Sequence, residues 1–131
     1  GKAFARGLLE AKKILIVAGD AVEALEVYYP YYRCLEAGFD VTIAAPSAKK
    51  LQTVLHDFVD GMDTYIERPA YGLQANEAFE NINPELYDGL IIPGGRAPEY
   101  ILKKIKKQLA LFPNCFSFAY KRPNPTKYFF Q

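Results

Sequence analysis

Residues 13–18 form a continuous apolar, β-branched run after Lys13, and two further stretches are predominantly apolar: 40–45, with Val41, Ile43 and Ala44, and 89–92. Each is followed by a glycine or a proline. Hydrophobic runs without alternation are typical of strands in a parallel sheet that is covered on both faces. Residues 22–37 have helical spacing, so the chain begins with a predicted strand, helix and strand, a unit whose crossover is almost always right-handed.

The predicted helix over residues 22–37 ends before Gly38, a common C-terminal stop. Pro30 lies inside the pattern, so we expect it to kink the helix or to delay its regular part. Cys34 is expected to be a buried packing residue rather than a reactive thiol. The expected apolar face consists of Val22, Leu25, Val27, Tyr28, Tyr32 and Leu35.

The middle of the chain has a different pattern. Residues 51–68 indicate two short strands around a turn, a hairpin at the edge of the sheet. Residues 76–81 predict a short helix or loop, and 83–87 a single turn. A second helix begins near residue 96, with a proline in its first turn. This order of elements predicts an α/β fold, a three-layer doubly wound sandwich with a mainly parallel sheet.

Composition narrows the class of protein. The chain has 131 residues, 50% of them hydrophobic, and a net charge of +1, which fits one domain rather than a disordered or generally basic chain. Two cysteines are too few for a disulfide scaffold or a four-ligand zinc site. No apolar run approaches the roughly 20 residues that cross a bilayer, and the first residues make no convincing secretory signal. We therefore expect a cytoplasmic protein without a membrane partner.

The charges are distributed unevenly. Up to Glu99 there are nine Lys and Arg against fifteen Asp and Glu, whereas from Tyr100 onward there are seven Lys and Arg, no acid and no glycine. Such a change of composition marks a boundary. A basic, aromatic tail can bind nucleic acid. We favour the simpler interpretation, a charged helix face followed by disordered residues, and expect no nucleic-acid partner.

Candidate chemistry lies where the strands end, because ligands of open α/β sheets bind at the carboxyl ends of strands. The first loop lacks the glycine-rich motifs of dinucleotide and phosphate sites. Pro93 stands where a phosphoacceptor domain would need an aspartate. Gly94-Gly95 before a helix is either an anion-binding turn or simply a tight bend. Glu23 is either a functional carboxylate at the mouth of the first strand or a solvated surface group.

Several segments together resemble the ThiJ/PfpI superfamily, a class I glutamine-amidotransferase-like group that includes intracellular proteases and deglycases. The most specific of them is the string Pro-Gly-Gly-Arg-Ala-Pro-Glu at 93–99. The resemblance covers about residues 11–100 and implies a flavodoxin-like sandwich that forms homo-oligomers, dimers or hexamers, and works without a cofactor or metal. The segments that carry it are 13–20, 23–33, 56–58, 83–88 and 87–100.

The resemblance also implies roles for particular residues. The family's catalytic cysteine lies on a tight turn between a strand and a helix. Glu23 would hydrogen-bond that sulfur and favour the thiolate, and Gly95 would donate its backbone N–H to an oxyanion hole. Glu99 would reach a histidine of a neighbouring subunit. The family's activities are peptide hydrolysis, conversion of methylglyoxal to lactate, and removal of early glycation adducts; the last two share thiolate attack on a carbonyl or hemiaminal.

The expected Cys-His-Gly segment is missing. Cys115 comes twenty residues after Gly95 and is the remaining candidate for the nucleophile, but Phe116 follows it and no nearby glycine permits the strained turn. The single histidine, His56, lies in the predicted hairpin, where we favour a surface or edge role over catalysis. The candidate catalytic residues are therefore Glu23, Gly95, Glu99 and Cys115.

Two questions stay open at the level of sequence. We treat 1–131 as one domain, with a family-like core over 11–100 and a divergent tail over 101–131. That tail is either the product of a frameshift or truncation, or a genuine replacement in which Asn114–Tyr120 forms a strand and Lys103–Lys107 a solvated helix face. The function is either that of a cysteine-dependent glyoxalase, deglycase or peptidase acting on a small carbonyl compound or peptide, or that of a non-catalytic binding or dimerisation module.

Overall fold

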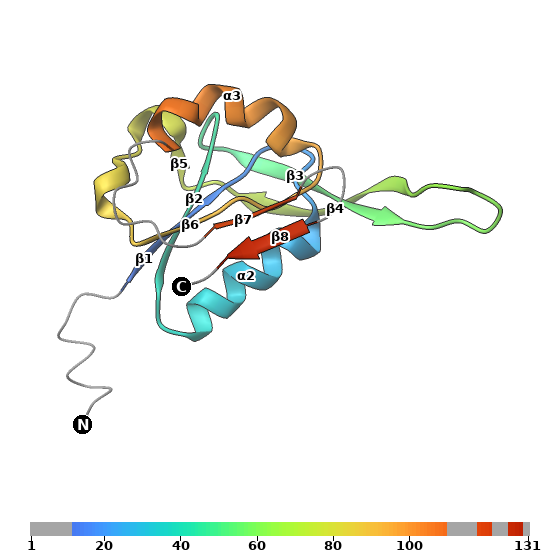
Figure 1. The fold of residues 1–131 in the computed structure, drawn as a ribbon, viewed down its shortest axis with the longest axis horizontal. Helices are drawn as coiled ribbons and strands as arrows, with labels where there is room; N and C mark the ends of the chain where they lie inside the picture. The colour runs from blue at the N-terminus through green and yellow to red at the C-terminus, as the bar shows by residue number, and fades with distance from the viewer. Residues whose placement is uncertain (1–11, 110–117, 122–125, 130–131) are drawn as a thin grey trace.

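The computed structural model describes residues 12–109, 118–121 and 126–129. Four parallel strands form the main sheet in the order β5-β2-β1-β6 (Figure 1). The edge strand β5 has two residues, too few for a periodic signal, which is why a helix or loop was predicted there. The strands are β1 (Lys13–Val17), β2 (Asp40–Ala45), β5 (Glu77–Ala78) and β6 (Gly89–Ile91).

Two helices cover opposite faces of this sheet, α2 (Ala24–Glu36) and α3 (Ala97–Leu109) (Figure 1). A separate antiparallel pair, β7 (Phe118–Lys121) and β8 (Thr126–Phe129), has β7 alongside β6. The predicted α/β fold, a three-layer flavodoxin-like sandwich, is thereby confirmed. After β1 the chain crosses to β2, which lies on one side of β1 in the sheet. After β6 it crosses to β7, which lies in the opposite direction. The boundary between β1 and β6 is therefore the topological switch point, where ligands of such folds bind.

Helix α2 differs in detail from the sequence prediction. It runs without interruption through Pro30, so the prediction of a delayed regular part is wrong. Its predicted apolar face is also partly wrong, because Leu25 is 74% exposed and Tyr32 and Leu35 are exposed as well. The most deeply buried side chains of the helix are smaller ones, and Tyr28 and Tyr31 pack against the core while partly buried. The buried positions are Ala24, Val27, Pro30 and Cys34.

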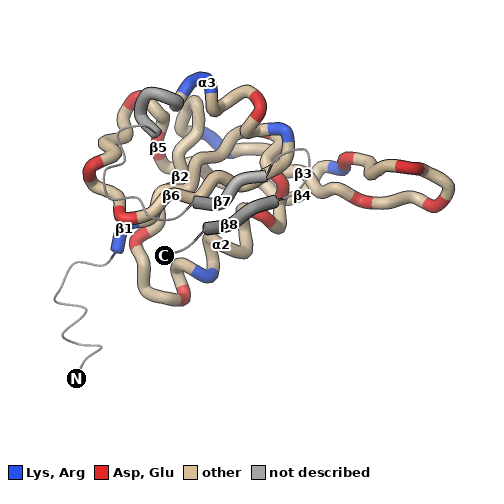
Figure 2. Tube along the Cα trace, in the orientation of Figure 1, with Lys and Arg blue, Asp and Glu red and all other residues tan. Residues whose placement is uncertain are grey.

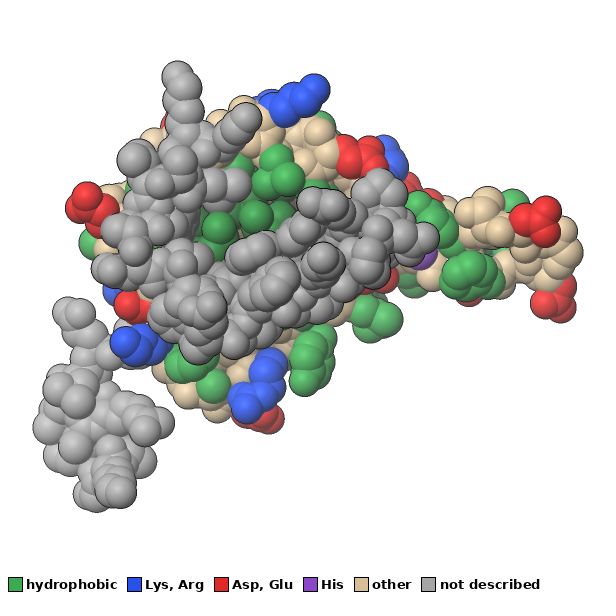
Figure 3. Space-filling view, in the orientation of Figure 1, with side chains coloured by type: hydrophobic (Ala, Val, Ile, Leu, Met, Phe, Trp, Pro, Cys, Tyr) green, Lys and Arg blue, Asp and Glu red, His purple; other side chains and the backbone are tan. Residues whose placement is uncertain are grey.

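The predicted hairpin is present as β3 (Lys50–Asp57) and β4 (Ile66–Gln74). It is not an edge of the main sheet but a two-stranded sheet of its own. Backbone hydrogen bonds join it to the loop after β1: Ala21 N–H donates to the Gln52 carbonyl at 2.8 Å and Val54 N–H to the Val22 carbonyl at 2.9 Å. Its far end projects from the body as an arm carrying acidic residues and exposed apolar side chains (Figures 2 and 3).

The core lies between the main sheet and both helices. It includes β1 residues Leu15 and Ile16, which are fully buried, and the α3 residues Ile101 and Ile105, which are equally inaccessible. The change of composition at Tyr100 thus falls inside a helix that packs on the core. Within the part of the chain that the structure describes, no helix is long and apolar enough to span a membrane.

Candidate active site

The loops that follow β1 and β6 meet at the switch point. Ile16 of β1 is in register with Ile91 of β6, so the two strands end side by side. Beyond them Val22 and Gly95 form an isolated antiparallel bridge. Its hydrogen bonds run from Glu23 N–H to the Gly94 carbonyl (2.9 Å) and from Arg96 N–H to the Ala21 carbonyl (3.0 Å). The structure therefore brings together Glu23 and the Gly94-Gly95 turn.

Glu23 is the N-cap residue of α2 and is only 7% exposed. Its backbone is extended, with φ −72° and ψ 130°, and its Oε2 accepts the Glu26 N–H at 2.8 Å. A carboxylate at this position also interacts favourably with the positive end of the helix dipole. Its Oε1 accepts no hydrogen bond from a described residue. Glu23 is therefore a buried carboxylate with one oxygen available, not a solvated surface group.

Gly95 has φ +91°, a conformation that side chains disfavour. A Cβ at this position would lie 2.6 Å from the Glu23 nitrogen and closer still to the Ala21 carbonyl oxygen. The antiparallel bridge uses the amides of Glu23 and Arg96, so the Gly95 N–H has no acceptor among the described residues. A fixed N–H without an internal partner is what an oxyanion hole requires.

The loop after β1 is held by several further contacts. Tyr100 of α3 donates its hydroxyl to the Asp20 carbonyl at 2.6 Å, and partial burial raises the pKa of Tyr100. The Asp20 carboxylate accepts Lys49 Nζ at 2.7 Å and Gln52 N–H at 2.9 Å, which together lower its pKa. Ala21 adopts φ +69°, a strained conformation for alanine. These contacts fix the loop that precedes Glu23.

A cluster that the sequence did not predict lies beside the Gly95 turn. Arg96 donates from Nε to both Glu67 oxygens, at 3.1 and 3.0 Å, and from Nη2 to Oε1 at 2.7 Å. This pairing is the main reason why the pKa of Glu67 is lowered. His56 lies opposite Glu67 in the hairpin register. In the sequence, the predicted hairpin is the feature that could have placed His56 near Glu67. Nothing in the sequence indicates the contact between Glu67 and Arg96.

The remaining candidates are placed as follows. Glu99 is exposed on the first turn of α3, and its contact with a neighbouring subunit stays a prediction. Cys115 lies outside the described residues, so its distance from Glu23 also stays a prediction. Cys34 is buried, as predicted, and burial raises the pKa of its thiol. No cluster of three or more metal-binding side chains occurs within the described ranges.

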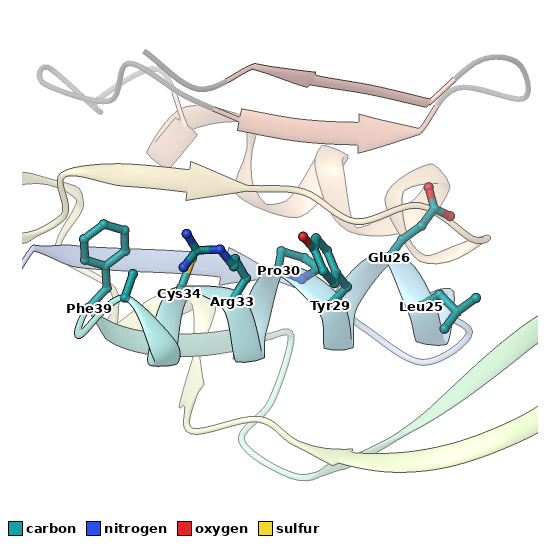
Figure 4. Close-up of a pocket in the computed structure, with 8 residues that line it drawn as sticks. Leu25, Glu26, Tyr29, Pro30, Arg33, Cys34 and Phe39 are labelled. Carbon is teal, nitrogen blue, oxygen red and sulfur yellow. The ribbon is translucent and has the colours of Figure 1, made fainter.

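A pocket of about 740 Å³ lies alongside α2, lined by residues of that helix and of the turn that follows it (Figure 4). None of the described residues that line it belongs to the loops after β1 or β6, so it is a feature separate from the candidate site. The lining residues are Leu25, Glu26, Tyr29, Pro30, Arg33, Cys34, Ala37 and Phe39.

The model of the DJ-1/PfpI family matches residues 12–111 of the chain. A DJ-1 homologue D from Arabidopsis thaliana is 36% identical over 97 residues, which are 72% of this chain and 25% of that protein. A deglycase from Pyrococcus abyssi is 35% identical over 89 residues, 68% of this chain and 45% of the relative. The chain thus spans between a quarter and under half of the length of these relatives.

Solved structures show the same fold. A two-domain protein from Anabaena variabilis, with DJ-1/ThiJ/PfpI-like and ferritin-like domains, has a TM-score of 0.59 at 22% identity. The similarity covers 76% of this chain and 27% of that one. A DJ-1 superfamily protein from Agrobacterium tumefaciens has a TM-score of 0.54 at 15% identity, covering 77% and 47%.

Proposed function

Because the chain belongs to the DJ-1/PfpI family, we propose that it carries the carboxylate and the oxyanion turn of a cysteine-dependent site for reactive carbonyl compounds or early glycation adducts. One observation carries the proposal: the buried Glu23 carboxylate lies beside a turn whose Gly95 N–H has no internal acceptor. The relatives named deglycases support this substrate class.

The chemistry needs a sulfur in addition to these two groups. A thiolate adds to the carbonyl carbon of the substrate, and the carbonyl oxygen becomes an oxyanion that the Gly95 N–H stabilises. Glu23 holds the thiol proton and thereby favours the thiolate. We assign the sulfur to Cys115, since burial makes Cys34 a poor nucleophile.

The family resemblance supports two further parts of the proposal. We propose a homo-oligomer in the cytoplasm, in which the exposed Glu99 at the start of α3 faces a second copy. Sedimentation of the wild type and of Glu99→Lys tests this: a shift of the variant to smaller species supports an interface there. Identical sedimentation of the two proteins contradicts it.

The activity is tested by following methylglyoxal loss and lactate formation. We expect the wild type to convert methylglyoxal, and Glu23→Gln and Cys115→Ser to lose about 100-fold or more in rate, the usual scale for a group that moves a proton or attacks the substrate. Cys34→Ser is the matched control and should keep the wild-type rate. Cys34 is buried near the C-terminal end of α2, whereas Glu23 caps its N-terminal end.

Two outcomes contradict the proposal. If the wild type and Cys115→Ser both consume methylglyoxal at the rate of the buffer, the chain is a non-catalytic module on the same fold. If Cys34→Ser abolishes the activity while Cys115→Ser retains it, the assignment of the sulfur is wrong.

A further inference from the structure

The hairpin β3–β4 is tied to the Gly94-Gly95 turn by a side-chain ion pair. Arg96 directly follows Gly95, and its guanidinium reaches across to Glu67 on β4, 29 residues away. Both Glu67 oxygens accept hydrogen bonds from this guanidinium, at 2.7 to 3.1 Å. Two or more hydrogen bonds between a guanidinium and a carboxylate restrict their relative orientation more than a single hydrogen bond does.

Glu67 also has a close neighbour within the hairpin, His56. Its side chain is 27% exposed, and His56 Nε2 lies 3.6 Å from its Oε2. The His56 ring stacks on Tyr65 with centroids 4.3 Å apart, and its side chain is only 10% exposed. Neither ring nitrogen of His56 has a hydrogen-bond partner among the described residues. The Glu67 carboxylate therefore lies between Arg96 on the turn and the largely covered imidazole of His56 on the hairpin.

We propose that Glu67 is a positioning residue, which acts through Arg96 to hold the Gly95 N–H in the direction that an oxyanion needs. The inference rests on the proposed function of Gly95. Two backbone hydrogen bonds also restrain the turn, those of Glu23 N–H and Arg96 N–H. Without the Glu67 carboxylate, the largely exposed Arg96 side chain has no described carboxylate acceptor, and the turn loses its direct side-chain link to the hairpin.

Amide hydrogen exchange tests this directly, without requiring activity. In Glu67→Gln we expect the Arg96 and Glu23 amides to exchange about tenfold faster, because local opening of the turn becomes easier. The Ile16 amide in the core strand β1 should keep its wild-type rate. The control is Glu80→Gln, an exposed carboxylate outside this cluster, which should change none of these amides.

An activity measurement separates positioning from stability. We expect Glu67→Gln to lower kcat by about tenfold with KM unchanged. The double variant Glu67→Arg with Arg96→Glu, which exchanges the two charges, should recover much of the loss.

Turn amides in Glu67→Gln that exchange at the wild-type rate overturn the inference. So does equal acceleration of the Ile16 amide, which would mean only a global loss of stability. A wild type without activity refutes the proposed function alone, since the exchange experiment still decides the role of Glu67.

Discussion

At the scale of single residues, the site depends most on a position where a side chain does not fit. We expect Gly95→Ala to lower the free energy of unfolding by about 3 kcal/mol or more, because φ +91° is strained for alanine and its Cβ would collide with backbone atoms of Ala21 and Glu23. Gly38→Ala is the control: Gly38 has φ +84° but nothing within 4 Å of an added Cβ. It should cost about 1 kcal/mol, from strain alone.

Urea unfolding of the two variants measures the difference. Equal costs for Gly95→Ala and Gly38→Ala would show that the backbone around Gly95 relaxes, and that the close approach of the two loops is not a fixed feature.

The charge of Glu67 predicts a pH dependence. The hydrogen bond from Arg96 lowers the pKa of Glu67 below its ordinary value of 4.5, so the folded state binds fewer protons than the unfolded state. The pairing therefore contributes stability above pH 4.5 that is lost as the pH falls through the folded pKa. The difference in unfolding free energy between wild type and Glu67→Gln should be largest near neutral pH and shrink in acid.

Urea titrations at several pH values test this prediction. Arg96→Gln should show the same trend, because it removes the group that lowers the pKa of Glu67. A difference between wild type and Glu67→Gln that does not change with pH would mean that the pairing does not stabilise the folded state.

The sequence identified some residues of the candidate site and missed others. Glu23 and Gly95 were singled out because they match a family motif, and their positions after the parallel strands β1 and β6 place them at one edge of the sheet. The burial of Glu23 was left open, since no pattern distinguishes a buried cap from a surface glutamate. The Arg96–Glu67 pair was missed because it joins two separate sheets, and their relative placement is set by packing.

At the scale of elements, the core strands β1, β2 and β6 and the hairpin were predicted, whereas the edge strand β5 and the exposed part of the α2 face were not. The runs at β1, β2 and β6 are long enough and apolar enough to identify. On α2 the rule that large apolar residues are buried failed for Leu25 and Tyr32, which lie on the exposed side of the helix. The hairpin was found, but its attachment was not, because the bonds that join it to residues 21–22 are backbone contacts without a sequence signature.

The arm of the hairpin gives a prediction at this scale. Phe58 is paired with Tyr65 if the register of Asp57 and Ile66 continues, so residues 59–64 can be replaced by Asn-Gly, a turn that suits a two-residue hairpin loop. Val59 and Met62 are exposed, so we expect the unfolding free energy to change by less than about 0.5 kcal/mol. The Tyr65 contact with His56 is kept.

Thermal or urea unfolding of the shortened chain is the measurement. A loss of several kcal/mol would show that the arm tip stabilises the body, and that its apolar side chains are covered in the folded protein in solution.

At the scale of the whole molecule, the described residues hold one side of the proposed site, and the fold explains why. The two loops meet because β1 and β6 are adjacent while their crossovers lead in opposite directions. The thiol proposed to complete the site lies beyond α3, at Cys115, in a stretch outside the described residues. That end of the chain is basic and contains no glycine. The sequence alone therefore did not show whether it belongs to the fold.

Helix α3 links the two parts, and a core substitution in it tests whether the fold continues past Tyr100. Ile105 is fully buried in the core cluster, so Ile105→Ala should lower the unfolding free energy by about 3 kcal/mol, through lost burial and the cavity left behind. Lys104→Ala, one position earlier and exposed, should stay within about 0.5 kcal/mol of the wild type. If residues after Tyr100 were not selected for this fold, both variants would unfold like the wild type. A selective loss for Ile105→Ala means that the basic segment begins as part of the domain, and that the proposed nucleophile follows an element anchored in the same core as Glu23.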